Sequence, residues 1–145
     1  PANRKCSCPK NTVCPVDGQC LEKNIVYQAT VSSSDGTSET YIGLTAPPFK
    51  TRIGNHKKSI KYAAYAHETT LSSYVWKLKE QDLDYTIKWK LMARAKPFSP
   101  VTNVCNLCTQ EKYFIIFHPE LASLNSRNEI KSNCRHKESM LLDKT

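Results

Sequence analysis

The sequence NIVYQATVSSSDGTSETYIGLT, residues 24–45, decides the fold, because it holds two strand patterns with a turn between them. Residues 24–31 alternate and are rich in β-branched side chains, and residues 40–45 have the same character, so we predict a strand in each. The polar stretch between them contains Asp35-Gly36, a pair that is typical of a hairpin tip. The sequence therefore predicts a β-hairpin over 24–45.

Beyond the hairpin, two kinds of periodicity predict helices and one more strand. Apolar residues at spacings of three and four are typical of helices, and alternation of apolar and basic residues is typical of a half-buried strand. The predicted helices cover 47–61, 70–81, 107–117 and a short stretch around 126–132, and the predicted strand covers 84–92. The fold class is therefore α+β, a small antiparallel sheet (the hairpin plus a third strand) flanked by helices. We divide the chain into a Cys-rich element, 1–23, and the remaining domain, 24–145.

Composition and charge narrow the function classes. The 145 residues are 39% hydrophobic and 23% charged, which is close to globular averages and excludes wholesale disorder. The longest apolar run, 113–117, is far shorter than the roughly 20 residues of a membrane span, so we predict no membrane segment. The net charge is +8, and residues 50–100 hold 11 basic and 4 acidic side chains. Such a region attracts polyanions such as nucleic acid, and the alternative is a lysine-rich solvated surface.

The seven cysteines favour metal ligation over disulfides. Seven is an odd number and the sequence shows no secretory leader, so we expect thiolates in a reducing compartment. Cys6, Cys8, Cys14 and Cys20 lie in a loop-forming segment with proline and glycine, which needs zinc to hold its shape. The single residue between Cys6 and Cys8 leaves open whether one of them is a spectator.

A second zinc site is predicted near the C-terminus. Cys105 and Cys108 form a Cys-x-x-Cys turn, which places two sulfurs on one ion. Cys134 and His136 would supply the other two ligands after a 25-residue excursion. The alternative for the first pair is two buried free thiols.

Six polar side chains lie where the predicted elements could bring them together. They are Tyr27, Tyr41, Arg52, His56, Glu111 and Asn125. The hairpin can set Tyr27 and Tyr41 side by side, and Arg52 and His56 are four apart on one helix face. Each also has an ordinary structural explanation, as a core tyrosine or a solvated charge.

The order of these residues resembles the GIY-YIG nuclease family. IVY lies on one predicted strand, YIG on the next and R-x3-H on the following helix, then come a Glu before an aromatic-apolar run and an Asn in a late loop. The chain looks most like the endonuclease domain of Penelope-like retroelements, where the Cys-rich leader, YIGLT, the TIKWK-type strand, CNLC..EK, SLNSRNE and CRH recur together. The family's Gly-Ile-Tyr reads Ile25-Val26-Tyr27 here, so the tyrosine is kept and the close packing of the glycine is changed.

The resemblance implies a metal-dependent DNA endonuclease. It implies one divalent cation, Mg²⁺ or Mn²⁺, held by Glu111. Tyr27 would act as general base or orient the attacking water, and Tyr41 would position the water or hold the phosphate. A phenol has a pKa of about 10, so the base role requires the metal and Arg52 to lower the pKa of Tyr27. Asn125 would orient Glu111 or contact the backbone.

The remaining implied roles concern the proton and the DNA. Arg52 would donate to the non-bridging phosphate oxygens, and His56 would relay the proton from Tyr27 or steady the phosphate. Lysines on the first helix would follow the DNA backbone, with further ones beyond it. They are Lys50, Lys57, Lys58 and Lys61, then Lys77, Lys79, Lys88 and Lys90.

The resembled retroelements join the nuclease to a reverse transcriptase that extends the nicked DNA. We therefore expect a reverse-transcriptase partner and a nuclear location, with nicking that primes reverse transcription. Two alternatives stay open. One is a zinc-stabilised DNA-binding module without catalysis, and the other is a secreted cysteine-rich binder.

Overall fold

The computed structural model describes residues 6–9, 12–95 and 106–125, and in the last range it describes side chains from residue 110 onward. Within these ranges a three-stranded antiparallel sheet is combined with three α-helices, which confirms the predicted α+β class. The short helix predicted around 126–132 lies outside the described residues. None of the described helices is long and apolar enough to span a bilayer.

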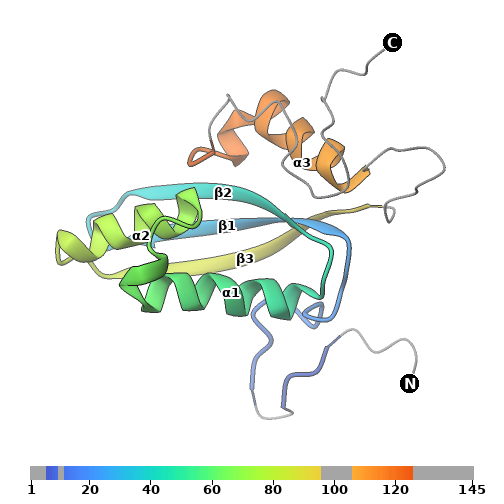
Figure 1. The fold of residues 1–145 in the computed structure, drawn as a ribbon, viewed down its shortest axis with the longest axis horizontal. Helices are drawn as coiled ribbons and strands as arrows, with labels where there is room; N and C mark the ends of the chain where they lie inside the picture. The colour runs from blue at the N-terminus through green and yellow to red at the C-terminus, as the bar shows by residue number, and fades with distance from the viewer. Residues whose placement is uncertain (1–5, 10–11, 96–105, 126–145) are drawn as a thin grey trace.

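The sheet has the order β2-β1-β3, so the first strand is central (Figure 1). β1 (Ile25–Ser33) pairs antiparallel with β2 (Ser38–Thr45), which confirms the predicted hairpin, and with β3 (Tyr85–Arg94) on its other side. At the hairpin tip Gly36 has a φ of +89°, a conformation that glycine adopts without strain. Both pairings leave β1 without an open edge, so its backbone is fixed by two neighbours.

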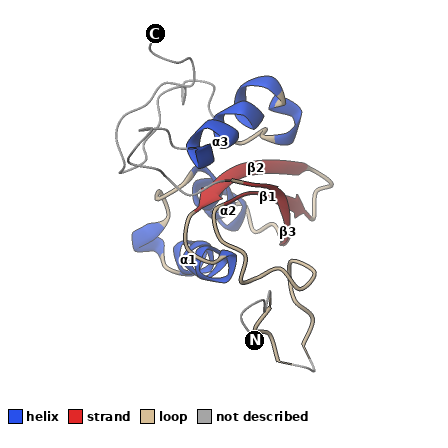
Figure 2. Cartoon of the chain, turned by 90° about the vertical axis from the view of Figure 1, so that its right-hand side faces the viewer, coloured by secondary structure: helices blue, strands red, loops and turns tan. Residues whose placement is uncertain are grey.

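Helices cover both faces of the sheet, as Figure 2 shows from the side. α1 (Phe49–Lys61), the 3-10 turn η1 (Ala63–Tyr65) and α2 (Thr70–Glu80) follow β2 along the chain, and α1 and α2 pack on one face. α3 (Asn106–Phe117) and the 3-10 turn η2 (Pro119–Leu121) lie on the other face. The helices predicted from periodicity therefore match α1, α2 and α3 to within two residues at each end.

β1 is buried on both faces, unlike a strand with one solvated face. Alternate residues of β1 point to opposite sides of the sheet. The larger core, on the α1/α2 face, includes Ile25, Tyr27, Ala29, Val31, Phe49, Ile53, Leu71 and Val75. The smaller core, on the α3 face, consists of Val26, Ile42, Ile115 and Ala122 with partly buried neighbours. The central strand thus connects two cores, and Tyr27 belongs to the larger one.

Candidate functional site

Tyr27 is the centre of a short chain of hydrogen bonds. Its side chain is fully buried on β1, facing α1. The hydroxyl accepts a hydrogen bond from Arg52 Nε at 3.0 Å and lies 2.6 Å from His56 Nε2. Arg52 and His56 are one turn apart on α1, so both reach the same phenol. The structure therefore brings Tyr27, Arg52 and His56, three of the six predicted residues, into direct contact at this hydroxyl.

The pKa shifts define where the protons lie in this chain. Burial raises the pKa of Tyr27, with a further rise from Tyr41 and an opposing effect of Arg52. Burial, and then the charge of Arg52, lower the pKa of His56 to about 3, so its imidazole is neutral. A guanidinium can only donate, so the Tyr27 hydroxyl donates its own proton to His56 Nε2. The lowering of the Tyr27 pKa by Arg52, expected from the sequence, is present, but burial outweighs it.

Gly43 makes room for the Tyr27 hydroxyl. The strand register pairs Gly43 with Tyr27. A Cβ on Gly43 would lie 2.4 Å from Tyr27 Oη and 2.9 Å from Cε1 of Tyr41, closer than real Cβ atoms approach other atoms. Sequence reasoning gave Gly43 no role, although a glycine inside a strand pattern often marks such a close approach.

Aromatic rings surround the buried phenol. The Tyr41 ring centroid lies 6.4 Å from that of Tyr27 and 5.8 Å from that of His56. Trp89, on β3, lies 5.5 Å from His56, and Phe49 lies 5.1 Å from Tyr27. These contacts exclude water from one side of the hydrogen-bond chain and strengthen its electrostatics. Sequence reasoning placed Trp89 only on the apolar side of a strand and missed its contact with the site.

Arg52 is held by both tyrosines. Burial lowers its pKa, but the hydroxyls of Tyr27 and Tyr41 raise it by more, so the guanidinium stays charged. A fixed guanidinium with donors left over is suited to a phosphate group.

Glu111 enters from α3, on the opposite side of the sheet. Its side chain is 14% exposed and its Oε1 lies 3.4 Å from Nζ of Lys112, which is itself buried. The charge of Glu111 raises the pKa of Tyr27, so the carboxylate lies within electrostatic range of the phenol. One partly exposed carboxylate is a donor that suits a hard divalent cation that keeps most of its water ligands.

Asn125 contacts the backbone of β2. Its Oδ1 accepts from the Ile42 N–H at 2.7 Å, and its Nδ2 donates to the Ile42 carbonyl at 2.9 Å. These two bonds occupy the backbone N–H and carbonyl that a further strand would pair with. They also fix the residues after η2 beside Tyr41. In the structure Asn125 acts on the protein backbone next to the site.

The N-terminal cysteines form a thiol cluster, which we define as Cys6, Cys8, Cys14 and Cys20. All four Sγ atoms lie within 4.8 Å of one another, and the Cys8–Cys20 and Cys6–Cys20 distances are 3.9 and 3.5 Å. Sulfurs at about 2.3 Å from a tetrahedral zinc lie roughly 3.8 Å apart. The thiol cluster could therefore hold a metal such as zinc with all four sulfurs, so neither Cys6 nor Cys8 need be a spectator.

The protonation of the thiol cluster also suits a cation. The hydrogen bond to Cys6, and then burial, raise the pKa of Cys8 to about 12. Burial raises the pKa of Cys14, but the backbone N–H groups of Val16 and Gly18 lower it to about 7. Without a cation Cys8 therefore resists becoming a thiolate, and a bound metal would remove that resistance.

The thiol cluster is joined to the first turn of α1. The Lys50 N–H donates to the Cys20 carbonyl at 2.6 Å, and the Phe49 N–H donates to the Glu22 carbonyl at 2.9 Å. The residue before the helix gives no side-chain cap, so these carbonyls satisfy N–H groups that would otherwise lack a helical partner. Figure 1 shows the N-terminal segment alongside α1. Because α1 carries Arg52, the thiol cluster supports one side of the site.

The lysines predicted to follow DNA share one side of α1, the side that faces away from Arg52. Lys57, Lys58 and Lys61 are exposed. At about 100° per residue, Lys57 and Lys61 lie about 140° and 180° from Arg52 around the helix axis, and Lys58 lies about 120° from it in the other direction. Lys50 donates to a serine of the Cys-rich segment at 2.9 Å. These lysines therefore lie on the opposite side of α1 from the guanidinium.

The second predicted zinc site lies outside the described part of the chain. Cys105, Cys134 and His136 are not among the described residues. The backbone of Cys108 lies in the first turn of α3, but its side chain is outside the described set. The four ligands therefore stay a sequence prediction.

Comparisons with protein-family models, with curated proteins and with solved structures return no match for this chain. Function therefore has to be inferred from the residues and the geometry described above.

Proposed function

We propose that this chain is a metal-dependent DNA endonuclease of the GIY-YIG type, as its sequence resemblance implies. The observation that carries the proposal is the buried chain Arg52–Tyr27–His56 with Glu111 in electrostatic range. A buried polar network is costly unless it is fully bonded, and strongly shifted titratable groups gather at functional sites. The reverse-transcriptase partner, the nuclear location and the priming role are proposed from the resemblance alone.

The proposed chemistry uses the direction of the protons. Hydrolysis of a phosphodiester needs a base that takes a proton from the attacking water. It also needs cationic groups close to the phosphate, which stabilise its negative charge in the transition state. His56 Nε2 is neutral and accepts the Tyr27 proton, so Tyr27 can take a proton from water as it gives its own to His56. This relay avoids a resting phenolate, which burial disfavours. Arg52 would hold Tyr27 through Nε and offer its other donors to the phosphate.

Two metal sites belong to the proposal. Glu111 would hold Mg²⁺ or Mn²⁺, which when bound neutralises phosphate charge and lowers the pKa of coordinated water. We assign zinc to the thiol cluster, because four thiolates at tetrahedral spacing make a closed structural site without an open position.

The test is relaxation of a supercoiled plasmid by the full chain with Mg²⁺ or Mn²⁺. We expect nicked circles, and loss of nicking in Glu111→Gln and in Arg52→Ala. Glu80→Gln is the matched control, because Glu80 is an exposed carboxylate at the end of α2. Nicking by Glu111→Gln at the wild-type rate would refute the role of Glu111.

The second candidate is a zinc-stabilised DNA-binding module without catalysis. One observation favours it: burial raises the pKa of Tyr27, so its phenol stays protonated and is not available as a phenolate base. In that case the zinc-loaded chain would bind duplex DNA in a salt-dependent way and leave the plasmid supercoiled with either cation.

A further inference from the structure

After α1 the chain turns through η1 and leaves two tyrosines in solvent. Tyr62 is 50% exposed and Tyr65 is 36% exposed. Ala63 and Ala64 between them are also exposed and are too small to cover the rings. Neither ring belongs to the two cores, so packing does not account for the pair.

Each of these rings has an ammonium group close to it. Lys58 Nζ lies 4.6 Å from the Tyr65 ring centroid, and Lys61 Nζ lies 5.4 Å from the Tyr62 ring centroid. Both distances are within the range of cation–π contacts. No acidic residue occurs between residues 40 and 67, so no carboxylate of this segment opposes the lysines. We define Lys58, Lys61, Tyr62 and Tyr65 as the tyrosine–lysine surface.

This combination is suited to nucleotides that are not base-paired. An exposed base stacks on an aromatic ring, and the adjoining phosphate meets a cation. The bases of an intact duplex are already stacked on each other, so an added tyrosine gives a duplex no comparable contact. We propose that the tyrosine–lysine surface binds unpaired DNA nucleotides of the strand beside the cut. This inference rests on the proposed endonuclease function and adds the form of its substrate.

The position of the surface predicts where the unpaired stretch lies. Arg52 and Lys61 are nine residues apart on α1, and a helix rises 1.5 Å per residue, so they are about 14 Å apart along the axis. A stacked strand advances about 3.4 Å per nucleotide. Lys61 also lies about 180° from Arg52 around the helix axis, so the strand must pass around α1 as well. The tyrosines would therefore meet the strand at least about four nucleotides from the scissile phosphate. We expect a substrate that is unpaired there to be bound more tightly than an intact duplex.

The experiment measures fluorescence anisotropy of a labelled 12-nucleotide DNA of mixed sequence with the full zinc-loaded chain, without Mg²⁺ or Mn²⁺. Replacing both tyrosines with alanine (Y62A/Y65A) should weaken binding about tenfold per tyrosine. Y62F/Y65F should bind within about twofold of wild type, because stacking needs the ring and not the hydroxyl. Y113A is the matched control, since Tyr113 is 47% exposed but lies on α3. Thermal melts should show that all three variants stay folded.

The inference would be overturned if Y62A/Y65A bound the 12-nucleotide DNA as tightly as wild type does. It would also be overturned if Y62A/Y65A lost the same affinity for duplex DNA, or if Y113A lost the same affinity for the 12-nucleotide DNA. A third contrary result is an affinity for RNA of the same sequence more than tenfold higher than for the DNA. The binding assay is repeated with Glu111→Gln, so that it does not depend on cleavage. Tyrosine-dependent binding by a chain that never nicks would end the endonuclease proposal and leave the surface standing. Nicking with tyrosine-independent binding would do the reverse.

Discussion

The two faces of the sheet hold their helices by different means. On the α1/α2 face a large apolar core surrounds the site, with Tyr27, Phe49 and Leu71 fully buried. On the α3 face the core is smaller, and hydrogen bonds between polar groups contribute more to holding the helix on the sheet. The first face is stabilised mainly by buried area, and the second depends on bonds that fix direction.

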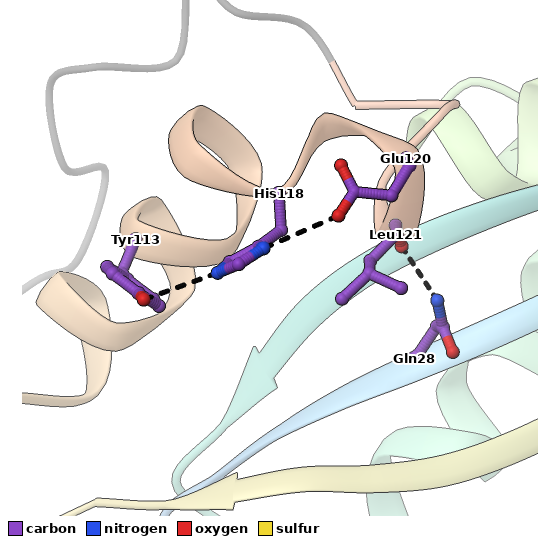
Figure 3. A network of polar contacts seen from close by, with 5 residues as sticks. All are labelled: Gln28, Tyr113, His118, Glu120 and Leu121. Carbon is purple, nitrogen blue, oxygen red and sulfur yellow. Dashed lines mark hydrogen bonds and ion pairs between the residues drawn. The ribbon is translucent and has the colours of Figure 1, made fainter.

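Figure 3 shows part of the second arrangement. Gln28 Nε2 on β1 donates to the Leu121 carbonyl of η2 at 2.8 Å. His118 lies 3.2 Å from the Tyr113 hydroxyl and 3.4 Å from a Glu120 carboxylate oxygen, and these contacts join the end of α3 to η2. Each bond contributes only about 1 kcal/mol, but together they set where α3 lies on the sheet.

The difference matters because the candidate site uses both faces. Tyr27, Arg52 and His56 belong to the first face, and Glu111 comes from α3 on the second. Changes on the α1 side should therefore cost stability and activity together. Changes around η2 should cost activity with a smaller loss of stability, because they alter the position of Glu111.

The largest effect is expected from removing the zinc that we propose for the thiol cluster. Cys14→Ser with Cys20→Ser should lower the free energy of unfolding by about 5 kcal/mol, and the melting temperature by about 10–20 °C. The reason is that the first turn of α1 would lose its support together with the proposed zinc. Differential scanning calorimetry with and without a zinc chelator measures this. A chelator that leaves the wild-type melt unchanged would show that the thiol cluster is not a metal site.

The second-largest effect is expected from removing the Tyr27 hydroxyl. Tyr27→Phe keeps the ring but removes the group that joins Arg52 to His56, so nicking should fall by about 10²–10³. Tyr74→Phe makes the same change on α2 and should leave nicking intact. Single-turnover plasmid relaxation gives the rate, and a wild-type rate for Tyr27→Phe would exclude it as the base.

The buried imidazole should make stability depend on pH. The folded pKa of His56, about 3, lies below the unfolded value of 6.5, so the unfolded state binds the proton first. As the pH falls from 6.5 to 4.5, His56 should therefore remove about 2–3 kcal/mol from the free energy of unfolding. Urea unfolding at both pH values measures the loss, and His56→Gln should show a loss smaller by that amount. Equal losses in both proteins would place the imidazole in contact with water.

Alanine substitutions at Gly43 and Gly54 distinguish a glycine that is needed for close packing from one that only adds backbone flexibility. Gly43→Ala forces a Cβ against the Tyr27 hydroxyl and should cost about 1–3 kcal/mol of stability, with loss of nicking. Gly54→Ala, on α1, meets nothing within 4 Å and should instead stabilise the chain by up to about 1 kcal/mol. Chemical denaturation compares the two, and a tolerated Gly43→Ala would mean that the phenol can move.

The smallest effect tests the α3 side directly. Asn125→Ala removes both bonds to Ile42 and should cost about 1–2 kcal/mol of stability. Nicking should fall by more than the lost stability explains, because Glu111 is then less firmly placed. Asn55→Ala, an exposed asparagine on α1, is the control. Full activity in Asn125→Ala would break the comparison between the two faces.

Local patterns predicted most of the fold. Alternation defined β1 and β2, and three-to-four spacing defined α2, because both signals lie within one element. The sequence did not predict that β3 pairs with β1, nor that β1 is buried on both faces. These features depend on contacts between distant segments, such as Ala29 with Trp89.

The candidate site was predictable in its residue types but not in its electrostatics. Resemblance named Tyr27, Arg52 and His56, which the structure brings together. The close approach at Gly43 depends on strand register, and the raised pKa of Tyr27 depends on burial. Register and burial are properties of the folded chain, so the sequence alone did not predict them. The contact of Trp89 with the site has the same origin.

The bond between Asn125 and Ile42 also has a consequence for self-association. β2 is an edge strand, and unpaired backbone groups on an edge invite strands from other molecules. Asn125 occupies the N–H and carbonyl of Ile42, and the Leu124 N–H and Ser123 Oγ occupy the carbonyl and N–H of Thr40. The residues after η2 thus close the outer border of the sheet, and a chain cut before them would be expected to aggregate through β2.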